Sequence, residues 1–297
     1  MTVPDYLRAR AYLLRATEPP APATHAFVVA HGAVEAVARL RTGTAPAAVL
    51  AEMRTPVPDL DPDVESDVAA IESGRARLVT PETDQWPTGL LRASSAHGRG
   101  VPLGLWMRGT GSLAQVTHRA VSVVGARAAT SYGEHVAADF GDSLARAGVT
   151  VITSGAYGAD SAALRGALGV GPVVAVLGHG VDVTYPLGHD HLFAEMIDRG
   201  GLLVSEYPFG MSPTRTRLAA RGRIIAALGA ATVVIEAGQR STALSTARTA
   251  RALGRRVFAV PGPITSSLSA GTNELLRTGE ATALTTVDPL LDAAGAR

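Results

Sequence analysis

From about residue 120 onward, short apolar runs alternate with longer segments of helical spacing. In the first unit an apolar strand at Val121–Val124 leads through a turn into a helix, and a second strand follows at Val149–Ile152. Ser131-x-x-Glu134 has the form of a capping box at the start of that helix, and Gly148 follows its end. Further strands are expected at Val173–Leu177, Leu202–Ser205, Thr232–Ile235, Val257–Val260 and Ala281–Leu284. This alternation predicts an α/β fold whose mostly parallel sheet is covered by helices on both faces.

The first 75 residues follow a different pattern. Helical spacing at Asp5–Arg15, His25–Arg41 and Pro46–Arg54 is interrupted by prolines, which predicts a small helical domain over residues 1–75. Its apolar content is low, so we expect little stability from this domain alone. A short strand is expected within 101–106, and the α/β domain then occupies residues 76–297.

Composition narrows the class of protein. The chain has 297 residues, enough for about two domains on the usual prior. Apolar residues make up 46% of it, which is ample for a packed core, and the absence of cysteine excludes disulfides and thiolate metal sites. The N-terminus lacks the pattern of a signal peptide, and no run of about 18 apolar residues predicts a membrane span. A soluble, cytoplasmic protein is therefore the default expectation.

Charge is distributed unevenly. The net charge is only +1, yet between Met211 and Pro261 nine arginines stand against one acid, Glu236. No lysine occurs anywhere in the chain, which coding bias explains most simply. Even so, a basic segment made of arginine alone is well suited to phosphates and to stacking on bases.

Small and polar residues follow the predicted strands, at the edge where parallel α/β sheets bind ligands. Gly125 and Arg127 follow the first strand, beside a helix N-terminus, and that arrangement suits a phosphate. The alternative is that Arg127 is an exposed loop residue. The loop from Ser154 to Asp160 follows the second strand, and Gly155 and Gly158 in it allow close backbone approach. Because small and polar residues follow several strands at the same edge of the sheet, they predict a concave polar pocket there.

Catalytic and cofactor motifs are missing. The chain has no G-x-G-x-x-G fingerprint, no P-loop and no nucleophile elbow. His189, Asp190 and His191 form a weak candidate metal cluster, since they lie on a loop without H-E-x-x-H. We therefore predict no metal, no cofactor and no catalytic residues.

Six short motifs, taken in order, resemble the DNA-processing protein A (DprA/Smf) family over about 86–291. They are Gln85-Trp86-Pro87 with Leu105-Trp106-Met107-Arg108-Gly109; Val123-Val124-Gly125-Ala126-Arg127; Ser154-Gly155-Ala156-Tyr157-Gly158-Ala159-Asp160; Arg221-Gly222-Arg223-Ile224-Ile225-Ala226-Ala227-Leu228; Glu236-Ala237 with Arg240-Ser241; and Pro261-Gly262 with Leu268-x-x-Gly271-Thr272-Asn273-Glu274-Leu275-Leu276.

The resemblance implies an extended Rossmann-like domain that binds single-stranded DNA without catalysis, forms a homodimer and loads the RecA recombinase during natural transformation. It also implies a small N-terminal helical domain, whereas the C-terminal winged-helix domain of many members is expected to be absent. Single-strand binding is expected through twelve residues of this chain: Gly125, Arg127, Ser154, Gly155, Gly158, Arg215, Arg217, Arg221, Arg223, Arg240, Ser241 and Asn273. Tyr157, Tyr207 or Phe209 could stack a base, although packing is the better explanation for Phe209.

Three departures from the family pattern involve four residues: Gly222 replaces the usual Asn, Thr242-Ala243 replaces Gly-Ser, and Ala126 replaces Ser. They leave the arginines in place and change the hydrogen-bond pattern around them. Two other functions stay open at this point. One is a nucleotide-processing enzyme of the phosphoribohydrolase type, although its Pro-Gly-Gly-x-Gly-Thr-x-x-Glu run is missing. The other is a scaffold that binds no DNA.

Overall fold

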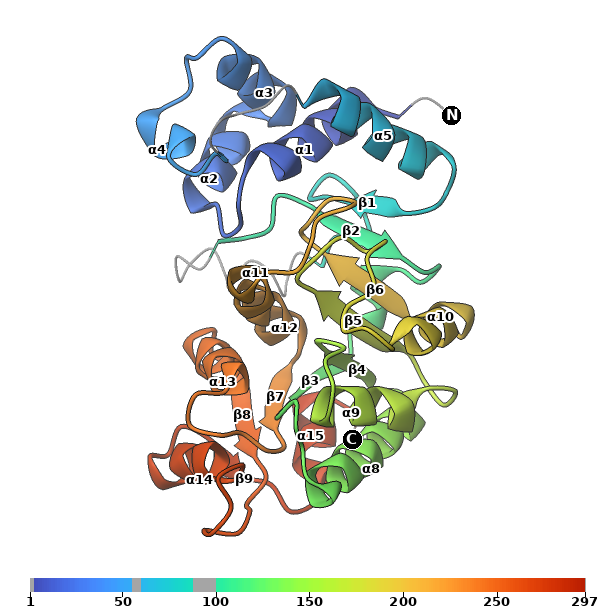
Figure 1. The fold of residues 1–297 in the computed structure, drawn as a ribbon, viewed down its shortest axis with the longest axis vertical. Helices are drawn as coiled ribbons and strands as arrows, with labels where there is room; N and C mark the ends of the chain where they lie inside the picture. Colours follow the sequence, from blue (N-terminus) through green and yellow to red (C-terminus); the bar gives the residue numbers. More distant parts are fainter. Residues whose placement is uncertain (1–2, 55–59, 88–99, 297) are drawn as a thin grey trace.

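The computed structural model describes residues 3–54, 60–87 and 100–296. Its centre is a nine-stranded sheet in the order β1-β2-β6-β5-β4-β3-β7-β8-β9, with helices on both faces (Figure 1). From β6 to β9 all neighbours are parallel, whereas β1 pairs with β2 and β2 with β6 in antiparallel fashion. The predicted α/β class with a mostly parallel sheet is confirmed.

The strands lie close to their predicted positions. They are β1 (Arg77–Val79), β2 (Leu105–Arg108), β3 (Ala120–Val124), β4 (Thr150–Thr153), β5 (Val173–Leu177), β6 (Leu202–Ser205), β7 (Ala231–Val234), β8 (Arg256–Ala259) and β9 (Thr282–Ala283). The predicted edges of the central strands differ by one residue at most. β1 was not anticipated, because three residues are too few to show alternation.

The helices of the α/β part are α7 (Leu113–Val116), α8 (Ser131–Arg146), α9 (Ala159–Ala167), α10 (Asp190–Asp198), α11 (Arg215–Ala220), α12 (Gly222–Leu228), α13 (Thr242–Ala252), α14 (Ala270–Arg277) and α15 (Asp288–Ala293). Alternate strand residues supply two apolar cores. Val151 packs in the core that contains α8 and α9, and its neighbour Ile152 packs in the core that contains α12 and α13. The strands are apolar on both faces because a layer of helices covers each face of the sheet.

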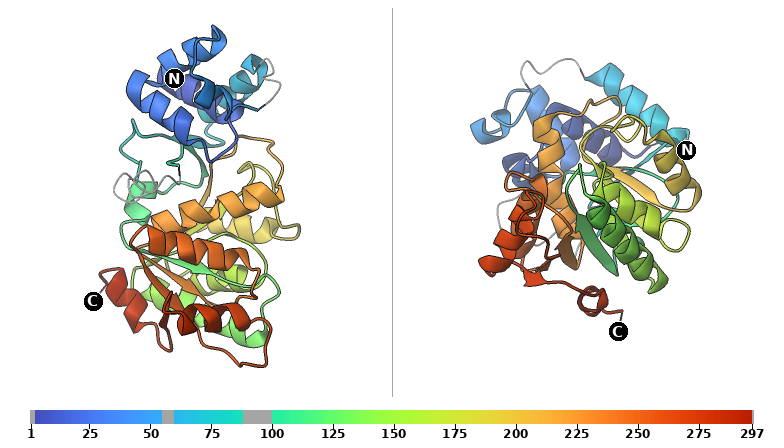
Figure 2. Two further views of the ribbon diagram at one scale, coloured as in Figure 1. Left: turned by 90° about the vertical axis from the view of Figure 1, so that its left-hand side faces the viewer. Right: turned by 60° about the horizontal axis from the view of Figure 1, so that its bottom comes forward.

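The N-terminal part is helical, with α1 (Asp5–Ala16), α2 (Pro22–His31), α3 (Ala33–Arg41), α4 (Ala47–Leu50) and α5 (Asp61–Glu72). These helices lie at the end of the molecule opposite α14 (Figures 1 and 2). The single helix expected over His25–Arg41 is wrong: Gly32 adopts φ +81° and separates α2 from α3. A helical N-terminal part agrees with the prediction, while the division at residue 75 stays a prediction.

Charged side chains join the N-terminal helices to the sheet. Glu18 accepts hydrogen bonds from Arg54 at 3.0 Å and from both Nε and Nη2 of Arg217 at 2.8 Å. Arg217 comes from α11, which lies directly before the helix that carries Arg221 and Arg223. Glu18 therefore connects the N-terminal part to α11 of the α/β part. Within the described ranges, no helix is both long and apolar enough to cross a membrane.

Candidate functional site

A narrow cavity lies at the carboxyl ends of β3 and β4, next to β7. The strand order reverses between β3 and β7, and α/β sheets bind ligands at such a switch point. We call it the arginine cavity, and its lining includes Val124, Gly125, Arg127, Ser154, Ala156, Asp160, Leu218, Arg221, Gly222, Ile225, Thr242 and Thr246. Its volume is about 30 Å³. That space holds little more than one or two water-sized groups, so it can take phosphate oxygens but not a nucleotide.

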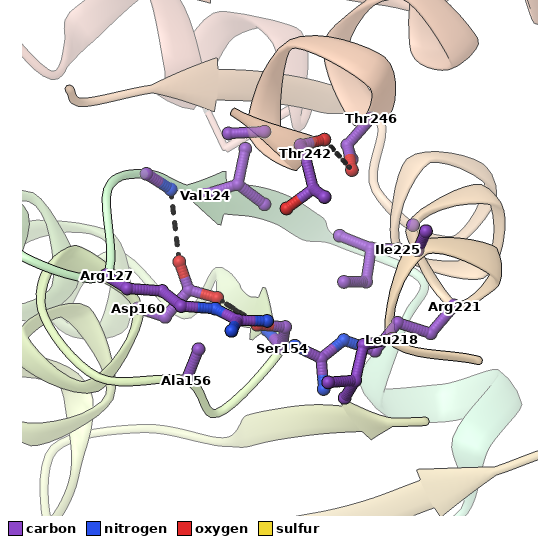
Figure 3. Close-up of a pocket in the computed structure, with 14 residues that line it drawn as sticks. Val124, Arg127, Ser154, Ala156, Asp160, Leu218, Arg221, Ile225, Thr242 and Thr246 are labelled. Atoms are coloured by element: carbon purple, nitrogen blue, oxygen red, sulfur yellow. Dashed lines mark hydrogen bonds between the residues drawn. The ribbon is translucent and has the colours of Figure 1, made fainter. Parts of the chain in front are cut away.

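Asp160 forms the base of the arginine cavity. Its carboxylate accepts hydrogen bonds from the backbone N–H groups of Gly125 and Ser154, each at 3.1 Å, and a further one from the Ser154 hydroxyl (Figure 3). Burial raises the pKa of Asp160, although the hydrogen bonds from Ser154 and Thr153 and the charge of Arg221 oppose this shift. Asp160 therefore joins the turns after β3 and β4 and fixes the distance between them.

Two guanidinium groups meet above this carboxylate. Arg127 and Arg221 extend toward one another from opposite sides of the cavity (Figure 3). Arg221 is buried, and burial together with the nearby charge of Arg127 lowers its pKa to about 10 despite the attraction of Asp160. Arg221 still carries its proton at neutral pH. Among the described residues neither arginine forms an ion pair, and the nearby carboxylate of Asp160 is the one acidic group in the lining that faces the two cations, so the site favours a further anion.

Two larger hollows share walls with the arginine cavity. The wide hollow, of about 600 Å³, is lined by Gly125, Ala126, Arg127, Ala128, Tyr185, Arg215, Leu218, Gly238, Arg240, Ser241, Thr242 and Leu268. The aromatic slot, of about 220 Å³, is lined by Arg127, Ala156, Tyr157, Tyr185, Pro186, Leu187 and Arg221. Arg127 therefore belongs to all three spaces, and a ligand larger than the arginine cavity can extend into either neighbour.

Seven of the twelve predicted residues are brought together. Gly125, Arg127, Ser154 and Arg221 line the arginine cavity, while Arg215, Arg240 and Ser241 line the wide hollow. Gly155, Gly158, Arg217, Arg223 and Asn273 line none of the three spaces. Whether the seven contact DNA stays a prediction.

Arg223 and Arg217 depart from their predicted places. The prediction that Arg223 joins Arg127 and Arg221 is wrong, because its Nη2 donates to Glu206 at 2.6 Å in a buried ion pair. Arg217 pairs with Glu18, a half-buried carboxylate that also pairs with Arg54, and its guanidinium lies 5.3 Å from the ring centroid of Tyr207. Both arginines thus have carboxylate partners within the fold. Tyr207 itself is buried and offers no face for a base.

The expected phosphate site at the first helix N-terminus is already filled. Glu236, which follows β7, accepts hydrogen bonds from the backbone N–H of Thr130 at 2.8 Å and from its hydroxyl at 2.7 Å. Thr130, whose hydroxyl accepts from the N–H of Gly133, is the N-cap of α8, so the predicted capping box at Ser131 is also wrong. An internal carboxylate thus takes the place that the helix dipole offers to a phosphate.

The remaining predicted residues have backbone roles. Gly158 has φ +72°, and a Cβ there would lie 2.3 Å from the carbonyl oxygen of Ala126. Gly155, with φ +65°, packs against the ring of Phe193. Asn273 exchanges hydrogen bonds with the backbone of Gly262, at 3.3 and 3.0 Å. These three residues shape or fasten loops and do not line the site.

Sequence reasoning missed the part that Thr246 takes. The position of Gly222 lies against it, since a Cβ at 222 would be 2.6 Å from the Thr246 hydroxyl oxygen. That hydroxyl therefore leaves no room for a side chain at position 222 unless Thr246 moves. No local pattern signals this pairing, because the two residues lie on different helices. The candidate metal cluster of His189, Asp190 and His191 is not formed, because no three potential metal ligands lie close enough together within the described residues.

Comparison with known proteins places the chain among DNA-processing proteins. The family model for DNA recombination-mediator protein A matches residues 77–295. A DNA processing protein DprA of Mycobacterium tuberculosis is 45% identical over 295 residues, which cover 97% of this chain and 75% of that relative. Protein Smf of Escherichia coli is 36% identical over 217 residues, covering 73% of this chain and 56% of its own length.

Two solved structures are similar to this fold. The X-ray structure of DNA processing protein A from Streptococcus pneumoniae aligns with a TM-score of 0.76 at 26% identity, covering 98% of each chain. DNA processing protein A from Helicobacter pylori, whose structure concerns its single-stranded DNA binding mode, aligns with a TM-score of 0.61 at 25% identity, covering 73% of this chain and 94% of that one.

Proposed function

The chain belongs to the DNA recombination-mediator protein A family, and on that premise we propose that it binds single-stranded DNA at the arginine cavity and the wide hollow. The observation that carries the proposal is the meeting of Arg127 and Arg221 without an ion-pair partner among the described residues. A backbone phosphate supplies the missing anion, and a guanidinium can bind it through two parallel hydrogen bonds.

Two further arginines extend the cationic surface along the wide hollow. Arg215 and Arg240 are exposed and, within the described residues, form no ion pair. With Arg127, which lines the same hollow, and the buried Arg221 of the adjoining arginine cavity, they make four cations around one site. If about four phosphates are neutralised, log K falls against log salt with a slope of about −3 for a single strand. Binding is then strongly salt-sensitive and shows little sequence preference.

The same geometry argues against a nucleotide-processing enzyme. Carboxylates of Asp160 and Glu236 occupy the turns after β3 and β4 and the N-terminus of α8, where nucleotide enzymes of similar topology place phosphates. Incubation with AMP tests this alternative directly. Release of adenine would support an enzyme, and unchanged AMP agrees with a binding protein.

The proposal is tested with a fluorescent oligo-dT strand and fluorescence anisotropy across a salt series. Arg127→Ala, Arg215→Ala and Arg240→Ala remove exposed side chains, so the fold should survive each change. We expect each variant to flatten the salt slope by about 0.7. We also expect Arg127→Ala to weaken binding at least about tenfold, since it removes a charged hydrogen bond.

Arg251→Ala is the matched control. Arg251 is exposed on α13 and, in the described part of the chain, forms no ion pair; it also lies outside all three spaces. We expect its affinity and salt slope to equal those of the wild type. Wild-type values in all three test variants would contradict the assignment of this surface, and absence of any oligo-dT binding would leave the scaffold alternative.

We also propose, from the family resemblance, that the protein acts in the cytoplasm as a homodimer and loads RecA onto the strand it holds. Light scattering of the purified chain tests the dimer. The second test is the lag before RecA hydrolyses ATP on DNA coated with single-strand-binding protein. We expect the lag to shorten in proportion to the added protein, and an unchanged lag would count against loading.

A further inference from the structure

The short helix α11 contributes to the proposed DNA surface, yet little apolar packing holds it in place. Arg215 and Leu218 of this helix line the wide hollow, and Arg221, which follows it, lines the arginine cavity. None of the six residues of α11 is buried. A helix of this length is not stable by itself, because helices in proteins depend mainly on packing. The position of α11 must therefore come from polar contacts with neighbouring elements.

Arg217 makes the strongest of these contacts. Its Nε and Nη2 donate to the two oxygens of Glu18, each at 2.8 Å, and its Nη1 donates to the carbonyl oxygen of Ser212 at 3.0 Å. Two parallel hydrogen bonds between a guanidinium and a carboxylate fix direction as well as distance. Among the described residues this is the one ion pair that α11 forms. The backbone of α11 also passes close to Gly178, where a Cβ would lie 2.9 Å from the Arg217 carbonyl oxygen.

Glu18 is itself held firmly by the N-terminal part. It accepts a further hydrogen bond from Arg54 Nε at 3.0 Å, and its backbone N–H donates to the carbonyl oxygen of Glu52 at 3.3 Å. Arg54 donates from Nη1 to the carbonyl oxygen of Arg15 at 2.8 Å and from its backbone N–H to that of Ala16 at 2.9 Å. In Figure 1 α11 lies between α12 and the N-terminal helices. The N-terminal part thus presents a fixed carboxylate to α11.

We propose that Glu18 is a positioning residue for single-stranded DNA binding: through Arg217 it holds α11 where Arg215 can meet the strand. This inference rests on the proposed function and assigns a part in it to the N-terminal helices. Glu18 acts without touching the strand, since its partner Arg217 lines none of the three spaces. An α11 that is already ordered loses less conformational entropy when the strand binds.

The sign of the effect separates positioning from simple electrostatics. Removal of a carboxylate near a cationic surface should, by Coulomb's law, strengthen the binding of a polyanion or leave it unchanged. We expect Glu18→Ala to weaken oligo-dT binding instead, although this change makes the chain more positive. The expected loss is about two- to fivefold, the upper range for ion pairs near the surface. Loosening of the pair by this factor lowers the fraction of chains in which α11 is in place.

Glu82→Ala is the matched control. The Glu82 side chain is 35% exposed and that of Glu18 is 36% exposed. Glu82 also accepts two hydrogen bonds from one arginine, from Nε and Nη2 of Arg10 at 3.2 and 2.6 Å. This pair joins α1 to the segment after β1 and does not involve α11. Glu82→Ala therefore removes the same charge from a second contact of the N-terminal helices, and oligo-dT affinity should equal or slightly exceed that of the wild type.

A double-mutant cycle shows whether Glu18 acts through Arg217. Arg217→Ala breaks the same ion pair, so it should also weaken oligo-dT binding. In that background Glu18→Ala should cause no further loss, because its partner is already missing. Additive losses would show that Glu18 acts by another route and would overturn the positioning role.

Amide hydrogen exchange in α11, measured without DNA, keeps this inference apart from the proposed function. The backbone N–H groups of Leu218 and Arg221 donate to the carbonyl oxygens of Thr214 and Arg217, at 2.9 and 3.2 Å. Glu18→Ala should speed the exchange of these two amides by about two- to fivefold, whereas Glu82→Ala should not. Unchanged exchange in Glu18→Ala would overturn the positioning role.

The binding outcomes are equally distinct. Tighter oligo-dT binding by Glu18→Ala with a steeper salt slope would show that Arg217 is released to the strand, and would overturn positioning. Equal weakening by Glu82→Ala would do the same, since any loosening of the N-terminal part would then suffice. Failure of the wild type to bind oligo-dT would overturn the proposed function and this role with it, even where the exchange shows that Glu18 holds α11.

Discussion

The buried ion pair between Glu206 and Arg223 offers a sharp test of how this fold uses its arginines. Glu206 is 2% exposed and Arg223 is 8% exposed, and their closest atoms are 2.6 Å apart. Arg223 Nε and Nη1 and Glu206 Oε2 have no further partner within the described residues. Glu206→Ala removes the only carboxylate that the described chain pairs with Arg223, and so leaves a buried cation.

The expected loss is large. Removing one partner of a buried pair costs about 3–5 kcal/mol, because the other charge stays desolvated. For a domain of 150–250 residues each kcal/mol lowers Tm by about 2–4 °C, so Glu206→Ala should lower Tm by about 6–20 °C. The double variant with Glu206→Leu and Arg223→Met removes both charges and keeps apolar bulk. It should recover most of the loss, since such replacements are often neutral or stabilising.

Thermal unfolding followed by circular dichroism measures both variants. Glu280→Gln serves as the control, because it breaks the ion pair with Arg248 on a surface helix, where Arg248 is 53% exposed. Such a pair contributes about 0.2–1 kcal/mol, so its Tm should shift by about 4 °C at most. A wild-type Tm for Glu206→Ala would refute the reasoning. Loss of oligo-dT binding by a double variant with a wild-type Tm would show that Arg223 contacts the strand after all.

Two further changes probe the loops and the link to the N-terminal helices. Gly158→Ala should destabilise the chain by more than about 1–2 kcal/mol, because the residue adopts φ +72° and the new Cβ would clash with the Ala126 carbonyl oxygen. Gly148 serves as the control, since it adopts φ +71° but a Cβ there would have no atom within 4 Å. Gly148→Ala should therefore cost less free energy of unfolding and leave oligo-dT affinity unchanged. Burial opposes ionisation of Glu18, but hydrogen bonds from Arg217 and the charge of Arg54 outweigh this and lower its pKa below 4.5. Its stabilisation is therefore complete above pH 4.5 and is lost as the pH falls through the folded-state pKa. Glu18→Gln should then lower Tm at pH 7 by the equivalent of about 1 kcal/mol or less, since the carboxylate is partly open to water, and the difference should vanish in strong acid.

Much of this fold could be predicted because its central strands are apolar on both faces and are separated by helices of ordinary length. The errors have local causes. The predicted helix over His25–Arg41 ignored Gly32, which takes a left-handed φ that ends one helix and begins the next. The first cap was placed at Ser131 because its spacing to Glu134 fits a capping box, but Thr130 caps the helix and is itself fixed by Glu236. A residue 106 positions away cannot be seen in a local pattern.

The arginines show a different limit. Arg221 and Arg223 are two residues apart in a helical segment, so their side chains point about 200° apart and cannot face the same pocket. Geometry alone could therefore have separated them, and the structure places Arg221 in the arginine cavity and Arg223 against Glu206. The fate of Arg217 could not be foreseen, because its partner Glu18 lies 199 positions away. Counting basic residues along a segment overstates the charge that reaches a ligand.

The carboxylates of Asp160 and Glu236 explain why the sheet topology of a nucleotide-binding fold can favour a different ligand. In such folds backbone N–H groups at helix N-termini bind the phosphates of a small molecule. Here Asp160 accepts from the N–H groups of Gly125 and Ser154, and Glu236 accepts from that of Thr130, so those donors are already used. The groups that remain to bind an anion are the cationic side chains around the wide hollow. Long flexible cations can follow an extended backbone of phosphates, whereas a rigid cradle of N–H groups would hold only one phosphate group in one position. Replacement of Asp160 by Asn should therefore weaken oligo-dT binding by loosening the two turns, without creating affinity for mononucleotides, and tight AMP binding by that variant would contradict this account.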